Sequence, residues 1–132
     1  MVKKMEAKDI VVYVAGPLSD NECGYLQNVS RNLQTAKSIK ELGYSVIAPS
    51  CDLLLGLQAG NYEYYDYADN SLAIMKKCDI LFLDIGWENS KGCLNEKKVA
   101  NELGIPIAKA YYEIDIIALD LGMDDIERRF GE

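Results

Sequence analysis

Residues 9–17 read Asp-Ile-Val-Val-Tyr-Val-Ala-Gly-Pro, and this stretch decides the fold class. Its apolar run from Ile10 to Ala15 is rich in β-branched residues, which is typical of a strand that is buried on both faces. Gly16 and Pro17 then end the strand. A strand buried on both faces predicts a sheet that is covered by helices on either side.

The sequence after this strand alternates between helical and extended patterns. Apolar residues spaced three or four apart predict an amphipathic helix over residues 25–42, which Gly43 ends. Further strands are expected at residues 44–48, 79–84 and 105–110, and further helices at residues 68–78 and 93–103. Residues 51–67 are expected to form a long loop with some helix, and the region around residues 114–121 either a fifth strand or a helix.

This alternation indicates one α/β domain over residues 1–132, with a parallel sheet of four or five strands and helices on both faces. Right-handed crossovers place every strand-to-helix loop at the carboxyl edge of such a sheet, where ligands bind. We therefore expect a ligand site among the loops at residues 16–24, 49–66 and 84–92.

The composition excludes several mechanisms. The chain of 132 residues has no histidine, so Ser-His-Asp catalysis, Cys-His catalysis and histidine metal sites are impossible. Its formal net charge of −7 argues against a nucleic-acid polymer as partner, although a mononucleotide needs only a local pocket. Any acid–base chemistry must come from carboxylates, Tyr, Lys or Cys.

The same composition predicts a cytoplasmic protein without a membrane partner. No apolar stretch approaches the roughly 20 residues of a membrane span, and the apolar run after Asp9 is too short for a secretory signal. The four cysteines are widely spaced, which favours reduced thiols, and we expect no metal site.

The loop and helix over residues 86–96 are the most informative candidate site. Ser90 is a plausible N-cap, Gly92 allows a ligand to approach the backbone, and amides at the start of the helix favour an anion such as phosphate. We expect the positive helix end to lower the pKa of Glu96, which suits an ionised nucleophile. The competing interpretation is that Glu96 is an ordinary solvated helix residue.

Two further groups are candidates for a site. Gly16 and Pro17 follow the first strand, where a ligand approaches the backbone, while Tyr13 is either a site residue or a core tyrosine. Residues 62–69 contain Tyr65 and Asp69: the tyrosines either stack on a nucleobase or pack over the sheet edge, and Asp69 is a possible second carboxylate. No G-x-G-x-x-G or Walker A sequence is present, which disfavours NAD and P-loop ATP.

Taken in order, several short motifs resemble the nucleoside 2-deoxyribosyltransferase superfamily. They cover roughly residues 10–110 and are Val12–Pro17, Glu41–Tyr44, Cys78-Asp79, Gly86–Glu88, Ser90-x-Gly92-x-x-x-Glu96 and Glu102–Pro106. The resemblance implies a flavodoxin-like three-layer sandwich, cleavage of the N-glycosidic bond of a deoxynucleoside or its 5′-monophosphate, no cofactor, and a homodimer or larger homo-oligomer. It places the nucleophile at Glu96 and the tyrosine that orients it at Tyr13.

The sequence departs from the family pattern at one position and matches a particular branch at another. Ser71 stands where family members commonly have an aspartate, so Asp69 is the nearest replacement for the second carboxylate. Ser90 stands where the nucleotide N-hydrolases have a serine facing the 5′-phosphate, which favours a phosphorylated ligand over a free nucleoside.

Two other classes of function make different predictions. A non-catalytic nucleotide-binding module of the same fold is consistent with Ser71. A flavodoxin-like redox domain predicts a yellow protein, and a signal receiver domain needs paired acidic residues after its first strand, which Val14-Ala15-Gly16 lacks.

Overall fold

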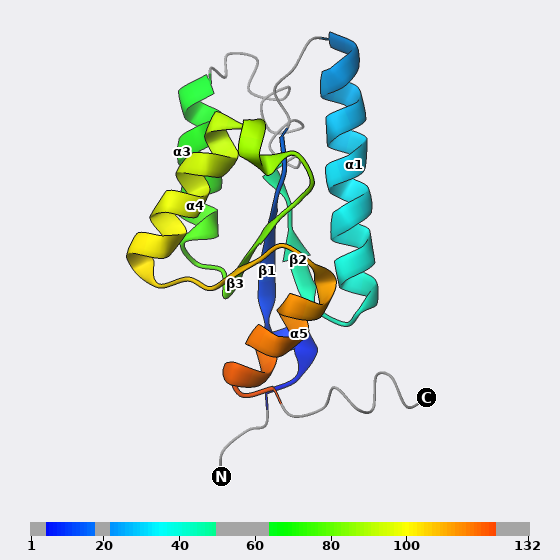
Figure 1. The fold of residues 1–132 in the computed structure, drawn as a ribbon, viewed down its shortest axis with the longest axis vertical. Helices are drawn as coiled ribbons and strands as arrows, with labels where there is room; N and C mark the ends of the chain where they lie inside the picture. Colours follow the sequence, from blue (N-terminus) through cyan, green and yellow to red (C-terminus); the bar gives the residue numbers. More distant parts are fainter. Residues whose placement is uncertain (1–4, 18–21, 50–63, 124–132) are drawn as a thin grey trace.

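The computed structural model describes residues 5–17, 22–49 and 64–123 (Figure 1). Side chains at 22–26 and 64–68 are not among the described ones. The sheet has four parallel strands: β1 (Val11–Ala15), β2 (Ser45–Ile47), β3 (Ile80–Leu83) and β4 (Ile107–Ala108), in the order β2-β1-β3-β4. The predicted α/β class with a parallel sheet is confirmed, with four strands in the described part of the chain.

Helices cover both faces of this sheet. The elements are α1 (Glu22–Glu41), α3 (Tyr64–Met75), α4 (Lys91–Leu103) and α5 (Tyr111–Asp120), with 3-10 turns η1 (Ala7–Asp9) and η3 (Trp87–Asn89). Figure 1 shows α1 and α5 on one face and α3 and α4 on the other. This three-layer arrangement is flavodoxin-like. The region around residues 114–121, which the sequence predicted as either a strand or a helix, lies mostly in helix α5.

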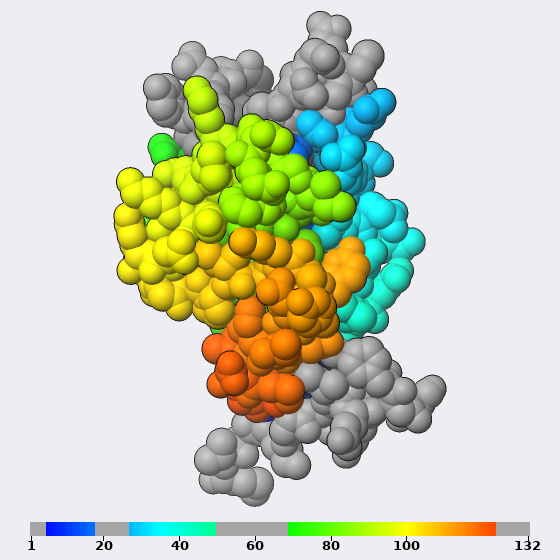
Figure 2. All heavy atoms as spheres, viewed as in Figure 1, coloured from blue at the N-terminus to red at the C-terminus, as the bar shows by residue number. Residues whose placement is uncertain are grey.

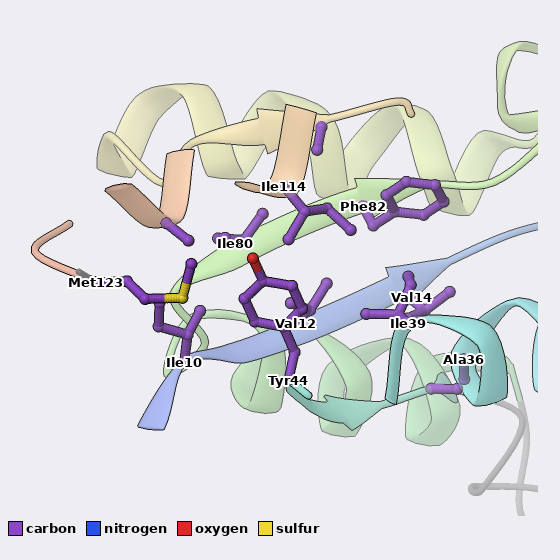
Figure 3. Close-up of a cluster of buried hydrophobic side chains, with 13 residues drawn as sticks. Ile10, Val12, Val14, Ala36, Ile39, Tyr44, Ile80, Phe82, Ile114 and Met123 are labelled. Atoms are coloured by element: carbon purple, nitrogen blue, oxygen red, sulfur yellow. The ribbon is translucent and has the colours of Figure 1, made fainter. Parts of the chain in front are cut away.

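The first layer of core lies between the sheet and the helices α1 and α5. Val12 and Val14 of β1 point into it, because alternate residues of a strand face opposite sides. Figure 3 shows these valines beside Ile39 of α1 and Ile114 of α5. Tyr44 is also buried here, and its hydroxyl donates a hydrogen bond to Asp115 Oδ1 at 2.5 Å.

The second layer of core lies between the sheet and the helices α3 and α4. The odd-numbered residues of β1 and β3 face it together with apolar residues from both helices, namely Tyr13, Ala15, Leu81, Leu83, Met75, Cys93 and Ala100. Tyr13 is the one buried tyrosine of β1 and β3, and its side chain belongs to the candidate site.

Strand β4 is shorter than the expected strand at residues 105–110. Before it, Ile105 donates its backbone N–H to Ala100 at the end of α4, and Pro106 has no N–H to donate. After it, the Lys109 N–H donates to the Glu113 carboxylate at 2.9 Å instead of continuing the ladder. Local hydrogen bonds at both ends therefore limit this strand to Ile107–Ala108.

The strand order reverses between β1 and β3, which are adjacent central strands. Such a switch point is where α/β sheets bind ligands, outside the carboxyl ends of the strands. The segments that leave the two strands here are Gly16-Pro17 and residues 84–90. No described helix is both long enough and apolar enough to cross a membrane.

Candidate functional site

The centre of the site is a contact between strand β1 and helix α4. Tyr13 lies in the middle of β1 and is almost fully buried, and its hydroxyl lies close enough to the Glu96 carboxyl group to lower the pKa of that group. Oxygen Oε2 of Glu96 is also buried, and it has no hydrogen-bond partner among the described residues. A buried polar atom with no partner is costly in a folded protein, so this oxygen marks a place where a ligand can bind.

The expected low pKa of Glu96 is wrong. Burial raises the pKa of this carboxyl group from 4.5 to about 7, while the hydrogen bond from Tyr13 acts in the opposite direction. The positive end of a helix acts mainly within its first turn, and Glu96 is the sixth residue of α4. Desolvation therefore outweighs the helix dipole, and the alternative of an ordinary solvated helix residue is also wrong.

Helix α4 begins as the sequence predicts. Ser90 is its N-cap, and the Ser90 hydroxyl oxygen accepts the Cys93 N–H at 3.2 Å. The amides at the start of a helix lack acceptors within the helix, so residues 91 and 92 offer donors to an anion. A methyl group on Gly92 would lie no closer than 3.8 Å to the Ser90 Oγ, so packing does not require glycine here.

Gly16 has a different role, because packing leaves no space for a side chain. A methyl group on it would lie 3.3 Å from Asn32 Nδ2 and 3.3 Å from Asp84 Cβ. The neighbouring Pro17 packs against the next loop, since a methyl group on Gly86 would lie 3.1 Å from the proline Cγ. The two loops that leave β1 and β3 are thus in direct contact at the switch point.

A buried polar cluster, which the sequence did not reveal, lies beside these loops. It consists of Asn32, Thr35 and Asp84, all nearly inaccessible to solvent. The Thr35 hydroxyl donates to Asp84 Oδ2 at 3.0 Å, and the Asn32 amide donates to the Val14 carbonyl at 3.0 Å. The available signal was an aspartate placed directly after the last apolar residue of a buried strand.

Cys93 lies close to both acidic groups but is not a nucleophile. Burial raises the pKa of its thiol to about 11, and the carboxylates of Glu96 and Asp84 act in the same direction, against a lowering hydrogen bond from Ser90. A thiol with this pKa stays protonated at neutral pH. Both carboxylates are therefore within electrostatic reach of one buried position.

Two lysines flank the tryptophan of the loop. The Lys97 and Lys109 ammonium groups each lie 4.9 Å from the centroid of the Trp87 ring, which is the distance of a cation–π contact. Trp87 also packs against the core layer beneath α4. These contacts hold the outer side of the loop against α4 and the end of β4.

Of the aromatic and acidic candidates on α3, only Asp69 has a described side chain. The side chain of Asp69 is exposed on α3, whereas Glu96 is half-buried on α4 and its Oε2 is inaccessible to solvent. Tyr65 lies in the first turn of α3, but its side chain is outside the described residues. Across the described parts of the chain, no three metal-ligating side chains group together.

The arrangement is suited to carboxylate chemistry. Near neutral pH, a group with a pKa of about 7 is present in both its protonated and ionised forms. Its ionised form is disfavoured by burial, so a ligand that develops positive charge beside Oε2 gains more from it than from a solvated carboxylate.

Comparison with known proteins identifies the family. No curated protein shows a significant match to the chain. A family model described as "Domain of unknown function (DUF4406)" matches residues 10–109, from the residue before β1 to the residue after β4. The matched range includes Tyr13, the switch-point loops, Asp84 and Glu96. The chain therefore belongs to the DUF4406 family of domains of unknown function.

Proposed function

We propose that this protein cleaves or transfers at the N-glycosidic bond of a deoxynucleoside or its 5′-monophosphate, with Glu96 as the nucleophile. The observation that carries the proposal is the buried Glu96 Oε2, which lacks a partner among the described residues and belongs to a carboxyl group whose pKa the Tyr13 hydroxyl lowers. The resemblance to the nucleoside 2-deoxyribosyltransferase superfamily supports the same roles for these two residues.

In the proposed reaction, an ionised Glu96 oxygen attacks the anomeric carbon of the sugar. A bond forms between this carbon and the oxygen, and the bond to the base nitrogen breaks, so the base leaves with the electron pair and takes a proton from solvent or from an acid. Water or an acceptor base then displaces Glu96 and restores the carboxylate. The Tyr13 hydroxyl donates its hydrogen bond to the carboxyl group and fixes its direction.

The start of α4 supports a phosphorylated substrate. Unused amides at a helix N-terminus attract an anion, and the Ser90 hydroxyl still has its own hydrogen to donate after accepting the Cys93 N–H. The adjacent Lys91 adds a positive charge, and its side chain is exposed. We therefore favour a 5′-monophosphate over a free nucleoside.

The second carboxylate of the reaction is a separate part of the proposal. Asp69 is exposed on α3, the helix that packs beside α4. Its role as an acid requires that substrate binding bring the leaving base to it. Replacement of Asp69 by Asn tests this role, and we expect slower release of bases that need protonation.

The direct test is an assay of base release. The protein is incubated with the deoxynucleosides and their 5′-monophosphates, with and without an acceptor base, and the bases are separated by chromatography. We expect release or exchange by the wild type, loss of it in Glu96→Gln, and a covalent sugar adduct of Glu96 in intact-mass spectra. Turnover that survives in Glu96→Ala would exclude Glu96 as nucleophile.

The second candidate is a non-catalytic nucleotide-binding module, favoured by Ser71 at the position of the family aspartate. It predicts no base release from any substrate of the panel. It also predicts that a 5′-monophosphate raises the melting temperature, because a ligand that binds only the folded state stabilises it.

We propose that the active species is a homo-oligomer in the cytoplasm. Helix α5 exposes Tyr112, Ile116 and Leu119, spaced as one stripe along the helix. Figure 2 shows the orange region of the chain, which includes α5, at the surface of the molecule. A second copy of the chain would shield such a stripe from water. Light scattering of the purified protein tests the assembly, and a monomer would contradict it.

A further inference from the structure

The end of strand β3 reverses the usual distribution of polar and apolar residues. Asp84 is only 5% exposed, whereas the next residue, Ile85, is 79% exposed. An aspartate is almost never fully buried unless it is paired, so the buried Asp84 is the informative residue here, whereas a single exposed aliphatic side chain is ordinary. Such a local conflict is expected at functional sites rather than in a structural turn.

Hydrogen bonds on both oxygens hold Asp84 in place. Oδ2 accepts from the Thr35 hydroxyl of α1 at 3.0 Å, and Oδ1 accepts from the Ile85 N–H at 2.9 Å. The backbone of Asp84 is also bonded on both sides: its N–H donates to the Ala15 carbonyl at 2.8 Å, and its carbonyl accepts the Trp87 N–H at 3.1 Å. One residue thus connects α1, the end of β1 and the beginning of the next loop.

This loop leads directly to the helix of the candidate nucleophile. Gly86 adopts a left-handed backbone conformation at φ 91°, η3 follows, and Ser90 then caps α4. The direction in which the chain leaves β3 therefore sets the place where α4 begins. A shift of the loop moves the Ser90 cap and, through the helix, the Glu96 carboxyl group.

We propose that Asp84 is a positioning residue of the candidate site: through Thr35 and the Ile85 N–H it fixes the loop at residues 85–90, and through this loop the start of α4. The catalytic part of this inference rests on the proposed function, whereas the loop part does not. Asp84 acts by accepting two hydrogen bonds, and its negative charge is not the property that the site uses.

Two substitutions of Asp84 separate hydrogen bonding from charge. In Asp84→Asn, the amide oxygen accepts the Ile85 N–H and the amide nitrogen donates to the Thr35 hydroxyl oxygen, so both contacts are kept without the charge. In Asp84→Ala both contacts are lost. Thr35→Val removes one of them at nearly constant volume and leaves the carboxylate in place, which provides a milder variant if Asp84→Ala does not fold.

Asp79 at the other end of β3 provides the matched control. Its Oδ2 accepts the Val11 N–H at 2.8 Å, so Asp79→Ala also removes a carboxylate bonded to a backbone amide of the sheet. This contact lies at the amino end of the strand, away from the loop. Asp79→Ala therefore reports what loss of a hydrogen bond elsewhere on the same strand does to the Trp87 signal.

The chain has a single tryptophan, Trp87, and it lies in the loop itself. Its fluorescence and the 19F spectrum of 5-fluorotryptophan-labelled protein therefore report the loop directly and without any turnover. We expect Asp84→Ala to shift the 19F resonance and to increase quenching by acrylamide, Thr35→Val to do so less, and Asp84→Asn and Asp79→Ala to resemble the wild type.

The kinetic readout uses the substrate that the wild type turns over. We expect kcat to fall about 100-fold in Asp84→Ala, as for a misplaced reactive group, and to be retained in Asp84→Asn. An unchanged Trp87 signal in Asp84→Ala, or an equal change in Asp79→Ala, would overturn the proposal. Loss of kcat in Asp84→Asn with an unchanged Trp87 signal would also overturn it, because the charge would then be what matters. If the wild type turns over no substrate, the Trp87 signals still decide the role of Asp84.

Discussion

Strand β3 has an aspartate at each end, and the two carboxylates are in opposite environments. Asp79 at the amino end is exposed and bonded to the Val11 N–H, while Asp84 at the carboxyl end is buried among side chains of α1. Around Asp79, the neighbouring polar contacts are also solvent-accessible: the Ser45 hydroxyl donates to the Lys8 carbonyl at 2.7 Å, and Lys8 forms an exposed ion pair with Glu6.

The carboxyl end of the sheet has the costly features. A buried Glu96 oxygen lies there without a partner among the described residues, Asp84 is buried, and Ile85 is exposed. Polar groups at the amino end contribute to stability in the ordinary way, whereas the Glu96 carboxyl group at the carboxyl end reduces it when ionised. This difference is what the proposed function requires of the carboxyl end, and substitutions at the two ends should therefore affect different properties.

The largest effect is expected for Glu96→Gln. The amide keeps the shape of the side chain but cannot act as a nucleophile, so base release should fall by roughly 10³-fold or more. The measurement is the rate of base release under saturating substrate. Tyr13→Phe provides the comparison: it keeps the nucleophile and removes only its hydrogen bond, so its loss should be smaller.

Glu96→Gln should make the folded protein more stable than the wild type near neutral pH, although it lowers activity. Glu96 has a folded-state pKa of about 7 against 4.5 when solvated, so between these values the unfolded chain loses the proton first and the wild type becomes less stable as pH rises. Gln has no such loss. The advantage of Glu96→Gln in the free energy of unfolding should grow by about 2 kcal/mol from pH 5.5 to pH 8 in urea titrations. A constant difference would mean that Glu96 is not buried as a neutral acid.

The second effect concerns two glycines at the carboxyl end. Gly16→Ala forces a methyl group against Asn32 and Asp84 and should cost about 1–3 kcal/mol. Gly92→Ala meets no close atom and lies in the first turn of α4, so it should stabilise by up to about 1 kcal/mol. Thermal unfolding separates the two variants. If Gly92 lets a ligand approach the backbone, Gly92→Ala weakens ligand binding although it stabilises the fold.

The fold was predictable because its signals are local. Apolar runs such as Ile10–Ala15 and the spaced apolar residues of α1 are visible in the sequence, and alternation of strand and helix leaves few topologies. The ends of helices and strands were less predictable where a polar side chain takes a backbone hydrogen bond from the sheet. The diversion of the Lys109 N–H to Glu113, for example, ends β4 earlier than its apolar pattern suggests.

The candidate site was only half predictable, for a physical reason. The pairing of Tyr13 with Glu96 followed from the family resemblance, but the pKa of Glu96 depends on how deeply α4 packs against the sheet. The contact between Thr35 and Asp84 joins residues 49 positions apart, and no local pattern reports it. Candidate residues could thus be named where they belong to a motif, whereas the buried cluster that the tertiary structure assembles was missed.

The third effect tests the substrate class through the cap of α4. Ser90→Ala removes the acceptor of the Cys93 N–H and should cost about 1 kcal/mol in unfolding experiments. Ser90→Asp keeps a capping oxygen and the stability but adds a negative charge. If the site holds a 5′-phosphate, Ser90→Asp should raise KM for monophosphates and leave that for free nucleosides nearly unchanged. Equal effects on both substrates would contradict a phosphate contact at Ser90.

The smallest effect is expected at the amino end, and it decides whether the two ends are separate in function. Asp79→Ala removes one hydrogen bond from an exposed carboxylate to the Val11 N–H, so we expect a loss of about 0.5–1.5 kcal/mol in unfolding experiments. Since Asp79 lies at the far end of β3 from the switch point, kcat and KM should stay at their wild-type values. A loss of activity in Asp79→Ala beyond its loss of folded protein would mean that the whole strand, and not its carboxyl end alone, determines the geometry of the site.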